Sequence, residues 1–313
     1  MKIKNRAIGR PAIPRRVVVF VAAVLAGCSG NTATLDYVIV RELPHDTTAY
    51  TQGFLYANGH FYESTGLLGL SQLRRVNPGT GEVDAGVSLP ADRFGEGLAL
   101  LEDRLYQLTW KSRVGYVYEA ATLALVDSFS YAGEGWGLAT DGTSLIMSDG
   151  TAQLRFVDPA DFQVIRQVAV KDKGLPLSQI NELEYVNGEL FANIYRSDWI
   201  VRIDPRSGEV LGWIDLARLL PESRRTAATD VLNGIAFDDE SGHFFLTGKL
   251  WPTVFELRFQ TVVGDSVVGG KPARKVNSSL AGWPSRSRGA YAGIIARMVS
   301  RQSRPFWLEG SGW

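Results

Sequence analysis

Phe94-Gly95-Glu96-Gly97-Leu98 places one carboxylate between two glycines, with an aromatic residue two positions before it. Glycines on both sides leave the space around Glu96 free of neighbouring side chains and allow a tight backbone turn. A frame of this kind, a functional residue followed by Gly or Leu, recurs as Gln52-Gly53-Phe54, Glu96-Gly97-Leu98, Trp136-Gly137-Leu138, Glu182-Leu183-Glu184 and Asn233-Gly234-Ile235. We therefore expect five repeated segments that line one central site.

The spacing of these frames predicts the fold. Their second residues fall at positions 53, 97, 137, 183 and 234, which are 44, 40, 46 and 51 residues apart. Each unit continues with short apolar segments and turns such as Asp204-Pro205-Arg206-Ser207-Gly208, where Pro presets the turn. Four short antiparallel strands in about 40–50 residues are typical of a propeller blade. The sequence predicts an all-β, five-bladed β-propeller over residues 35–262; a β-sandwich with fortuitous spacing is the alternative.

The last unit ends near Phe259 and lacks a fourth strand of its own. The alternating segment 35–43 precedes the first frame and reads as a strand. We expect this N-terminal strand to complete the last blade, which closes the ring and leaves no exposed edge.

The N-terminus is predicted to be a targeting segment. Residues 1–27 carry six Lys and Arg and no acid, and the apolar run 17–25 is too short to span a bilayer. The run ends in Leu25-Ala26-Gly27-Cys28, which resembles a bacterial lipoprotein signal and holds the single cysteine of the chain. We expect a signal peptide over 1–27, lipidation of Cys28, a linker over 28–34, and export to the cell envelope. An ordinary secretory signal with a chance cysteine is the alternative.

Charge is distributed unevenly along the chain. Residues 271–313 hold eight Lys and Arg and one acid, which predicts a disordered basic tail over 263–313. This tail either has no function or contacts anionic surfaces through its aromatic residues. Residues 28–270 hold 19 basic and 32 acidic residues, so the main body is acidic and nucleic acid is not an expected partner.

Inner propeller strands converge on the axis, so the frames are expected to face one small space. That space would receive Gln52, Glu96, Trp136, Asn181 or Glu182, and Asn233, with Trp110, Tyr195 and Lys249 added from the second strands. A carboxylate, an ammonium group, amides and an aromatic wall suit a small polar ligand. In the alternative interpretation the tryptophans fill the core and Glu96 pairs with a surface Arg.

Metal chemistry has little support in the sequence. The three histidines, His45, His60 and His243, lie far apart and on no ligand spacing, so we expect structural roles for them and no metal or other cofactor. No Ser-His-Asp arrangement, Walker loop or dinucleotide fingerprint is visible. A lactonase-like hydrolase stays open as an alternative, with a calcium-type cluster formed by Glu96, Asn181 and Asn233.

Several motifs follow one another along the chain: Tyr50-Thr51-Gln52-Gly53-Phe54-Leu55-Tyr56, Phe94-Gly95-Glu96-Gly97, Leu108-Thr109-Trp110-Lys111, Gly135-Trp136-Gly137-Leu138, Asn181-Glu182-Leu183-Glu184-Tyr185, Leu232-Asn233-Gly234-Ile235-Ala236 and Thr247-Gly248-Lys249-Leu250-Trp251-Pro252. In this order they resemble the motifs of the glutaminyl cyclases of the plant and bacterial type. The resemblance runs from about Pro44 to Phe259. It implies a five-bladed propeller, without a metal, that converts N-terminal glutamine of peptides or proteins to pyroglutamate and releases ammonia. We expect such an enzyme to be a monomer.

Carried over residue by residue, the resemblance assigns catalytic roles to Glu96, Lys249 and Gln52, with Glu96 as proton shuttle. It assigns substrate binding to Tyr50, Phe94, Trp110, Trp136, Asn181 and Tyr195. Tyr50 stands where the family has Phe, and Tyr195 where it has Trp, so both positions stay aromatic. A lipid-anchored propeller that binds peptide or glycan at its axial mouth without catalysis is the alternative function.

Overall fold

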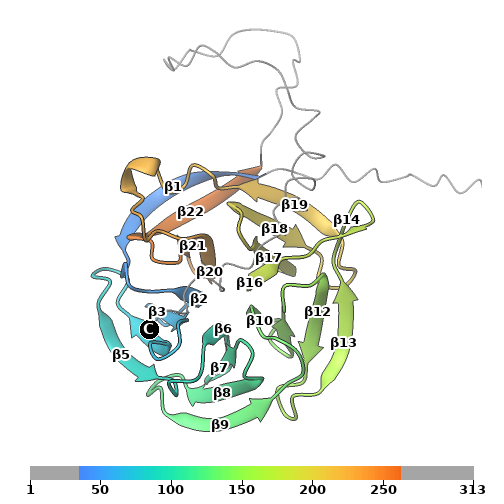
Figure 1. Ribbon diagram of the computed structural model, residues 1–313. Coiled ribbons are helices and arrows are strands. Elements are labelled where there is room, and N and C mark those ends of the chain that lie inside the picture. Colours follow the sequence, from blue (N-terminus) through green and yellow to red (C-terminus); the bar gives the residue numbers. More distant parts are fainter. Residues whose placement is uncertain (1–34, 262–313) are drawn as a thin grey trace, which may run out of the picture. The chain divides into compact units, whose positions relative to one another are not determined.

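The computed structural model describes residues 35–261, and its strands form five four-stranded antiparallel sheets around one axis (Figure 1). The first three blades are, from the axis outward, β2 (Thr51–Ala57), β3 (His60–Thr65), β4 (Gln72–Val76) and β5 (Val83–Ser88); β6 (Gly95–Leu101), β7 (Arg104–Thr109), β8 (Val114–Glu119) and β9 (Leu125–Ser130); and β10 (Leu138–Thr140), β11 (Leu145–Met147), β12 (Gln153–Val157) and β13 (Val164–Ala169). The predicted five-bladed propeller is confirmed, and the β-sandwich alternative is wrong.

The remaining blades follow the same order. They are β16 (Ile180–Val186), β17 (Glu189–Ile194), β18 (Trp199–Ile203) and β19 (Val210–Asp215), and then β20 (Leu232–Asp238), β21 (His243–Gly248), β22 (Thr253–Thr261) and β1 (Leu35–Pro44). A small hairpin of β14 (Lys171–Asp172) and β15 (Leu175–Pro176) lies between blades 3 and 4, and a 3₁₀ helix, η1 (Glu222–Arg224), lies between blades 4 and 5. No helix within residues 35–261 is long and apolar enough to cross a membrane.

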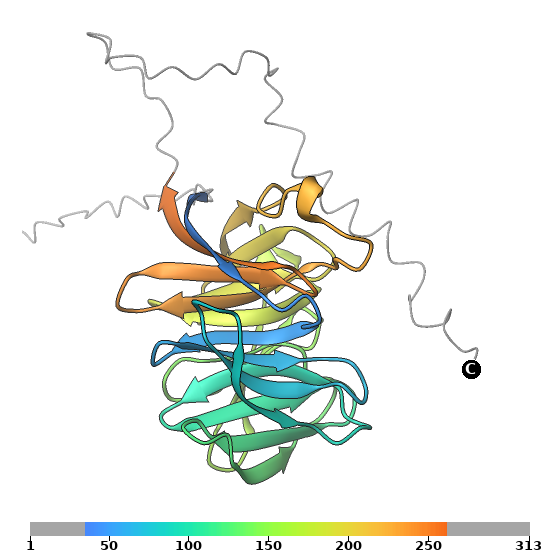
Figure 2. The same cartoon turned by 90° about the vertical axis from the view of Figure 1, so that its left-hand side faces the viewer.

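The N-terminal strand closes the ring, as predicted. β1 pairs antiparallel with β22 from Leu35↔Thr261 to Pro44↔Thr253, with a bulge between Ile39 and Arg41. Figures 1 and 2 show β1 in blue along the outer side of β22 in orange. The last blade thus combines the two ends of the described chain, so the fold cannot close until both are present.

The two glycines that flank Glu96 have a different role from the expected tight turn. Gly95 and Gly97 lie within β6, and neither has a positive φ. A Cβ on Gly95 would stand 2.6 Å from the carbonyl oxygen of Thr65, and one on Gly97 would stand 2.4 Å from the backbone nitrogen of Leu138. Glycine is required at both positions because β6 closely approaches the backbone of the blades on either side of it.

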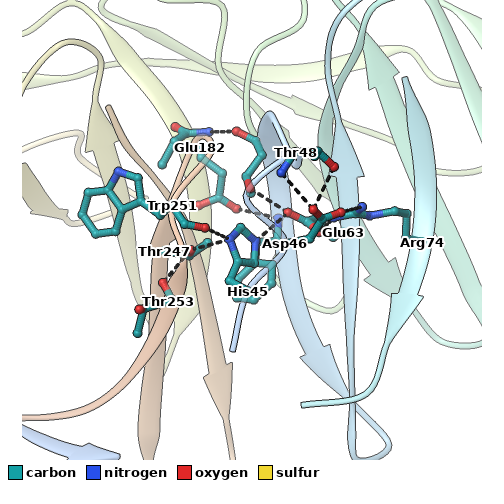
Figure 3. A network of polar contacts seen from close by, with 12 residues as sticks. His45, Asp46, Thr48, Glu63, Arg74, Glu182, Thr247, Trp251 and Thr253 are labelled. Carbon is teal, nitrogen blue, oxygen red and sulfur yellow. Dashed lines mark hydrogen bonds and ion pairs between the residues drawn. The ribbon is translucent and has the colours of Figure 1, made fainter. Parts of the chain in front are cut away.

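A buried polar network joins blades 1 and 5 where the ring closes (Figure 3). Glu63, 1% exposed, accepts hydrogen bonds from Thr51 Oγ1 at 2.6 Å and from the Arg74 guanidinium, and its Oε1 lies 3.1 Å from His45 Nε2. His45 Nδ1 donates to the carbonyl oxygen of Trp251 at 2.7 Å. Glu63 and Arg74 come from blade 1 and Trp251 from blade 5. We call this contact between blades 1 and 5 the seam, and the network joins the two blades there through charges that are paired.

Lowering the pH is expected to weaken this seam. Burial alone would raise the pKa of Glu63, but the charge of Arg74, followed by His45 and the hydrogen bonds, lowers it to about 2. A carboxylate with a depressed pKa stabilises the fold above its unfolded pKa, and this stabilisation is lost as pH falls from about 4.5 toward 2. The loss should reach about 3 kcal/mol, since one pKa unit corresponds to about 1.4 kcal/mol.

The measurement is urea unfolding of the parent and of Glu63→Gln between pH 3 and 7, with the exposed Glu240→Gln as control. We expect the difference in unfolding free energy between parent and Glu63→Gln to shrink as the pH falls, because the variant cannot ionise. A difference that stays constant across this range would show that the Glu63 charge does not stabilise the seam.

Candidate active site

The functional residues of four frames lie at irregularities in the inner strands. Strand pairing shifts register between Thr51 and Gly53, between Gly95 and Leu98, between Ile180 and Leu183, and between Leu232 and Ile235. Gln52, Glu96, Asn181 with Glu182, and Asn233 therefore occupy bulge positions. A bulge re-aims the side chain of its extra residue and is frequent next to active sites, so the local backbone explains why these polar residues turn out of the regular pleat.

The candidate residues gather at one end of the propeller. Neighbouring strands are antiparallel, so the start of each inner strand and the end of the following strand lie together. Tyr50, Phe94 and Trp136 precede β2, β6 and β10, whereas Trp110, Tyr195 and Lys249 follow β7, β17 and β21. The repeat therefore brings six of the nine predicted site residues to the same end of their blades.

Seven side chains at this end contact one another in a closed circuit, which we call the site circuit. Its contacts are Tyr50–Phe94 (centroids 6.2 Å apart), Phe94–Trp110 (5.7 Å), Trp110 Nε1–Glu134 Oε2 (2.7 Å), Glu134 Oε2–Trp136 Nε1 (3.0 Å), Trp136–Tyr195 (5.5 Å), Tyr195 centroid–Lys249 Nζ (5.5 Å) and Lys249 Nζ–Tyr50 centroid (4.8 Å). The predicted aromatic wall exists, and Lys249 is part of it through contacts with two ring faces.

Glu96 and Gln52 are buried beside this circuit. The two residues are 4% and 3% exposed, and Gln52 Nε2 donates a hydrogen bond of 3.2 Å to Glu96 Oε1. Within residues 35–261, the buried Oε1 of Gln52 has no hydrogen-bond partner. A buried acceptor of this kind is uncommon in a folded protein, and either a water molecule or a polar group of a ligand can donate a hydrogen bond to it. The interpretation in which Glu96 pairs with a surface Arg is wrong.

Burial shifts the two charged groups of the site in opposite directions. It raises the pKa of Glu96 well above its usual range; the charge of Lys249 opposes this shift, and that of Glu134 adds to it. Burial lowers the pKa of Lys249 to about 8, against the opposing effects of Glu96 and Asp230. An acid and an amine whose pKa values move toward each other are suited to proton transfer near neutral pH.

Asn181 and Asn233 stand together at the axis. Asn181 Nδ2 donates to Asn233 Oδ1 at 2.9 Å, and Asn233 Nδ2 donates to the carbonyl oxygen of Thr51 at 2.9 Å. Glu182 behaves differently, because its carboxylate accepts the backbone N–H groups of Phe54 and Ile235 and so links three blades. Of the pair considered at this frame, Glu182 has a structural role and Asn181 stays a candidate for substrate binding.

The three histidines lie in separate places, and each is close to a different acid. His45 belongs to the seam network, His60 lies 3.4 Å from Asp84, and His243 Nδ1 lies 2.7 Å from Glu256. Among the described residues, no group of three or more His, Cys, Asp or Glu is arranged to hold a metal ion. Of the residues in the calcium-type alternative, Asn181 and Asn233 are hydrogen-bonded to each other, with Asn233 Oδ1 as the acceptor.

Sequence reasoning missed two acids of the site. Glu134 joins the two tryptophans of the circuit, and Asp230 accepts a hydrogen bond of 3.0 Å from the Tyr50 hydroxyl. Glu134 had a visible signal, since Gly133-Glu134-Gly135 repeats the pattern of Gly95-Glu96-Gly97. Asp230 had no such signal in the sequence, because it lies in an irregular connection and its hydrogen-bond partner is 180 positions away.

These features define the class of protein: a five-bladed β-propeller with an acid and a lysine beside an aromatic wall at one end of its axis. The chain belongs to the glutamine cyclotransferase family, whose profile matches residues 17–259. It is 43% identical to the glutaminyl-peptide cyclotransferase of Arabidopsis thaliana over 243 residues, 74% of this chain and 75% of that protein. The crystal structure of Myxococcus xanthus glutaminyl cyclase superposes with a TM-score of 0.69 at 39% identity, over 74% of this chain and 99% of that one.

Proposed function

We propose that this protein is a glutaminyl-peptide cyclotransferase, which converts the N-terminal glutamine of peptides or proteins to pyroglutamate and releases ammonia. The observation that carries the proposal is the buried carboxylate of Glu96, held by Gln52 and influenced by the charge of Lys249. Membership of the family and the names of the two similar proteins support the same activity.

The reaction needs one proton to move between two nitrogens. The substrate α-amine attacks its own γ-carboxamide carbon, the new N–C bond closes a five-membered ring, and the bond to the carboxamide nitrogen breaks. An α-amino group has a pKa of roughly 7.7–8.0, so its proton is readily lost near neutral pH. Glu96 accepts that proton and returns it to the leaving nitrogen, which departs as ammonia.

The other site residues orient the substrate and stabilise charge. Lys249 donates to the amide oxygen as negative charge develops there, and its low exposure of 3% keeps that interaction strong. The side-chain oxygen of Gln52, which lacks a partner within residues 35–261, accepts the N–H of the substrate amine. Phe94, Trp110 and Trp136 hold the glutamine in the folded shape that brings amine and carbonyl together.

Incubation of the protein with a glutaminyl peptide tests this function. Mass spectrometry should show the loss of one ammonia from the peptide, and an ammonia assay should show release at the same rate. A peptide with N-terminal asparagine is the control, because its shorter side chain cannot close the same ring. A protein that binds glutaminyl peptides without releasing ammonia would be the non-catalytic binder instead, a class that needs neither the acid nor the lysine.

Chelators are expected to leave the rate of cyclisation unchanged, because the proposed proton transfer uses only side chains of the chain. The measurement compares the rate before and after dialysis against EDTA, followed by readdition of Ca²⁺ or Zn²⁺. Loss of activity that a metal restores would favour the lactonase-like alternative.

Attachment to a membrane through Cys28 is part of the proposal, although this residue lies outside the described residues, as do the predicted signal peptide, linker and basic tail. The motif Leu25-Ala26-Gly27-Cys28 supports it. Replacing Cys28 by Ser should move the exported protein from the membrane fraction to the soluble fraction, since no acyl chain is attached. Fractionation after a high-salt wash checks this, and a variant that stays with the membrane would point to another anchor.

A further inference from the structure

Glu134 is the one acid of the site circuit, and the proposed chemistry does not use it. It lies on the connection from β9 to β10, between blades 2 and 3, and its side chain is 37% exposed. A single oxygen, Oε2, accepts the indole N–H of Trp110 at 2.7 Å and that of Trp136 at 3.0 Å. An indole has one N–H and no acceptor, so each of these bonds occupies the polar group of its ring.

The two bonds join parts of different blades. Trp110 follows β7 in blade 2, and Trp136 precedes β10 in blade 3. Hydrogen bonds to a carboxylate are shorter and stronger than neutral ones. Glu134 therefore couples two rings that would otherwise depend on separate sheets for their orientation.

The backbone around Glu134 is held in place on both sides. The Arg155 guanidinium donates to the carbonyl oxygen of Glu134 at 2.8 Å, and the N–H of Gly135 donates to the carbonyl oxygen of Trp110 at 3.1 Å. Trp136 packs directly on Gly150, where a Cβ would stand 2.6 Å from its ring. A carboxylate on a fixed backbone can hold the two rings at a fixed separation.

We propose that Glu134 is a positioning residue that holds the rings of Trp110 and Trp136 at the separation and tilt that accept the substrate's glutamine side chain. The substrate named in this inference follows from the proposed cyclotransferase function, whereas the contacts from which it is argued do not depend on that function. The second carboxylate oxygen of Glu134, Oε1, lies 3.9 Å from Lys111 Nζ, and this solvent-exposed ion pair contributes little to stability.

The charge of Glu134 also acts on the proton shuttle. The charges of Lys249 and Glu134 shift the pKa of the Glu96 carboxyl in opposite directions, and the charge of Glu96 in turn contributes to the raised pKa values of Tyr50 and Tyr131. Because Glu134 raises the pKa of Glu96, neutralising Glu134 should lower that pKa. The effect of Glu134 on the position of the two rings and the effect of its charge on Glu96 can therefore be separated by two different substitutions of Glu134.

The test compares Glu134→Ala, which removes acceptor and charge, with Glu134→Gln, which keeps an acceptor oxygen and removes the charge. For Glu134→Ala we expect KM for a glutaminyl peptide to rise about tenfold or more, the effect of losing one hydrogen bond to a charged group. For Glu134→Gln we expect KM close to that of the parent and an acid limb of kcat/KM displaced to lower pH. Asp127→Asn, an exposed acid on β9, is the matched control and should change neither quantity.

Near-UV circular dichroism gives a readout that does not require activity. Glu134→Ala should lose tryptophan bands while its thermal unfolding midpoint stays near that of the parent, and the difference should vanish when Trp110 and Trp136 are both Phe. A parent without cyclase activity would refute the proposed function, yet this spectral comparison would still test Glu134. Parental KM and parental near-UV bands in Glu134→Ala would overturn the inference.

Discussion

Replacing Glu96 by Gln is expected to lower kcat by a factor of about 10²–10⁴, the usual contribution of a general acid–base group. This corresponds to roughly 3–5 kcal/mol in the activation barrier. Gln keeps the size of the side chain and can still hydrogen-bond to Gln52, but it cannot take the proton from the substrate amine. Single-turnover measurement of ammonia release from a glutaminyl peptide, for parent and variant, gives the ratio directly.

Binding and stability should separate this catalytic role from a structural one. The site circuit does not include Glu96, so the affinity for the peptide should change little. The thermal unfolding midpoint should hold or rise, because burial of this acid opposes its ionisation and Gln removes that cost. A variant that cyclises within a few-fold of the parent would remove Glu96 from the mechanism. Loss of activity together with loss of the fold would instead make Glu96 a structural residue.

Deletion of β1 is expected to abolish folding. This strand contributes the whole outer edge of blade 5 through its pairing with β22, and its Leu43 is buried among Phe54, Phe61 and Val254. Burial of one leucine stabilises a fold by roughly 1.5–3 kcal/mol, and each hydrogen bond adds about 0.5–1.5 kcal/mol. Since a domain is stable by only about 5–15 kcal/mol, the loss of this strand removes an amount comparable to the whole stability.

Two truncated proteins provide the measurement. One begins at residue 34 and keeps β1; the other begins at residue 45 and lacks it while keeping His45 and the seam network. Far-UV circular dichroism and a cooperative thermal transition should be seen for the first protein and not for the second. A cooperative transition in the shorter protein, even at lower temperature, would show that the ring closes without its N-terminal strand.

Much of this protein could be read from its sequence because propeller blades repeat. The frames at Gln52, Glu96, Trp136, Glu182 and Asn233 recur with the period of a blade, and the missing fourth strand of the last unit is matched by an alternating segment before the first. A repeated unit places equivalent residues at equivalent positions around an axis. Hence the five blades, the closing strand, and the gathering of Glu96, Lys249 and the aromatic wall at one end were predictable.

Contacts between the loops of different blades were not predictable, because the repeat period of the sequence does not determine which loop residues contact each other. The hydrogen bond from Tyr50 to Asp230 joins residues 180 positions apart, and the contact of His45 with Trp251 spans 206 positions. Asp230 and His45 lie outside the strands, where the repeat sets no position. Their partners depend on how loops from two blades meet, and only the closed ring decides that.

The sequence alone determined which residue types recur and with what period, and this is enough for the fold and the main members of the site. The tertiary structure decided how those members interact. It assigned Gly95 and Gly97 to close strand packing in place of a turn, and it gave Glu134 two indole partners from different blades. The physical reason is that strand period and turn chemistry act locally, whereas steric fit and hydrogen bonding between blades exist only after the ring has closed.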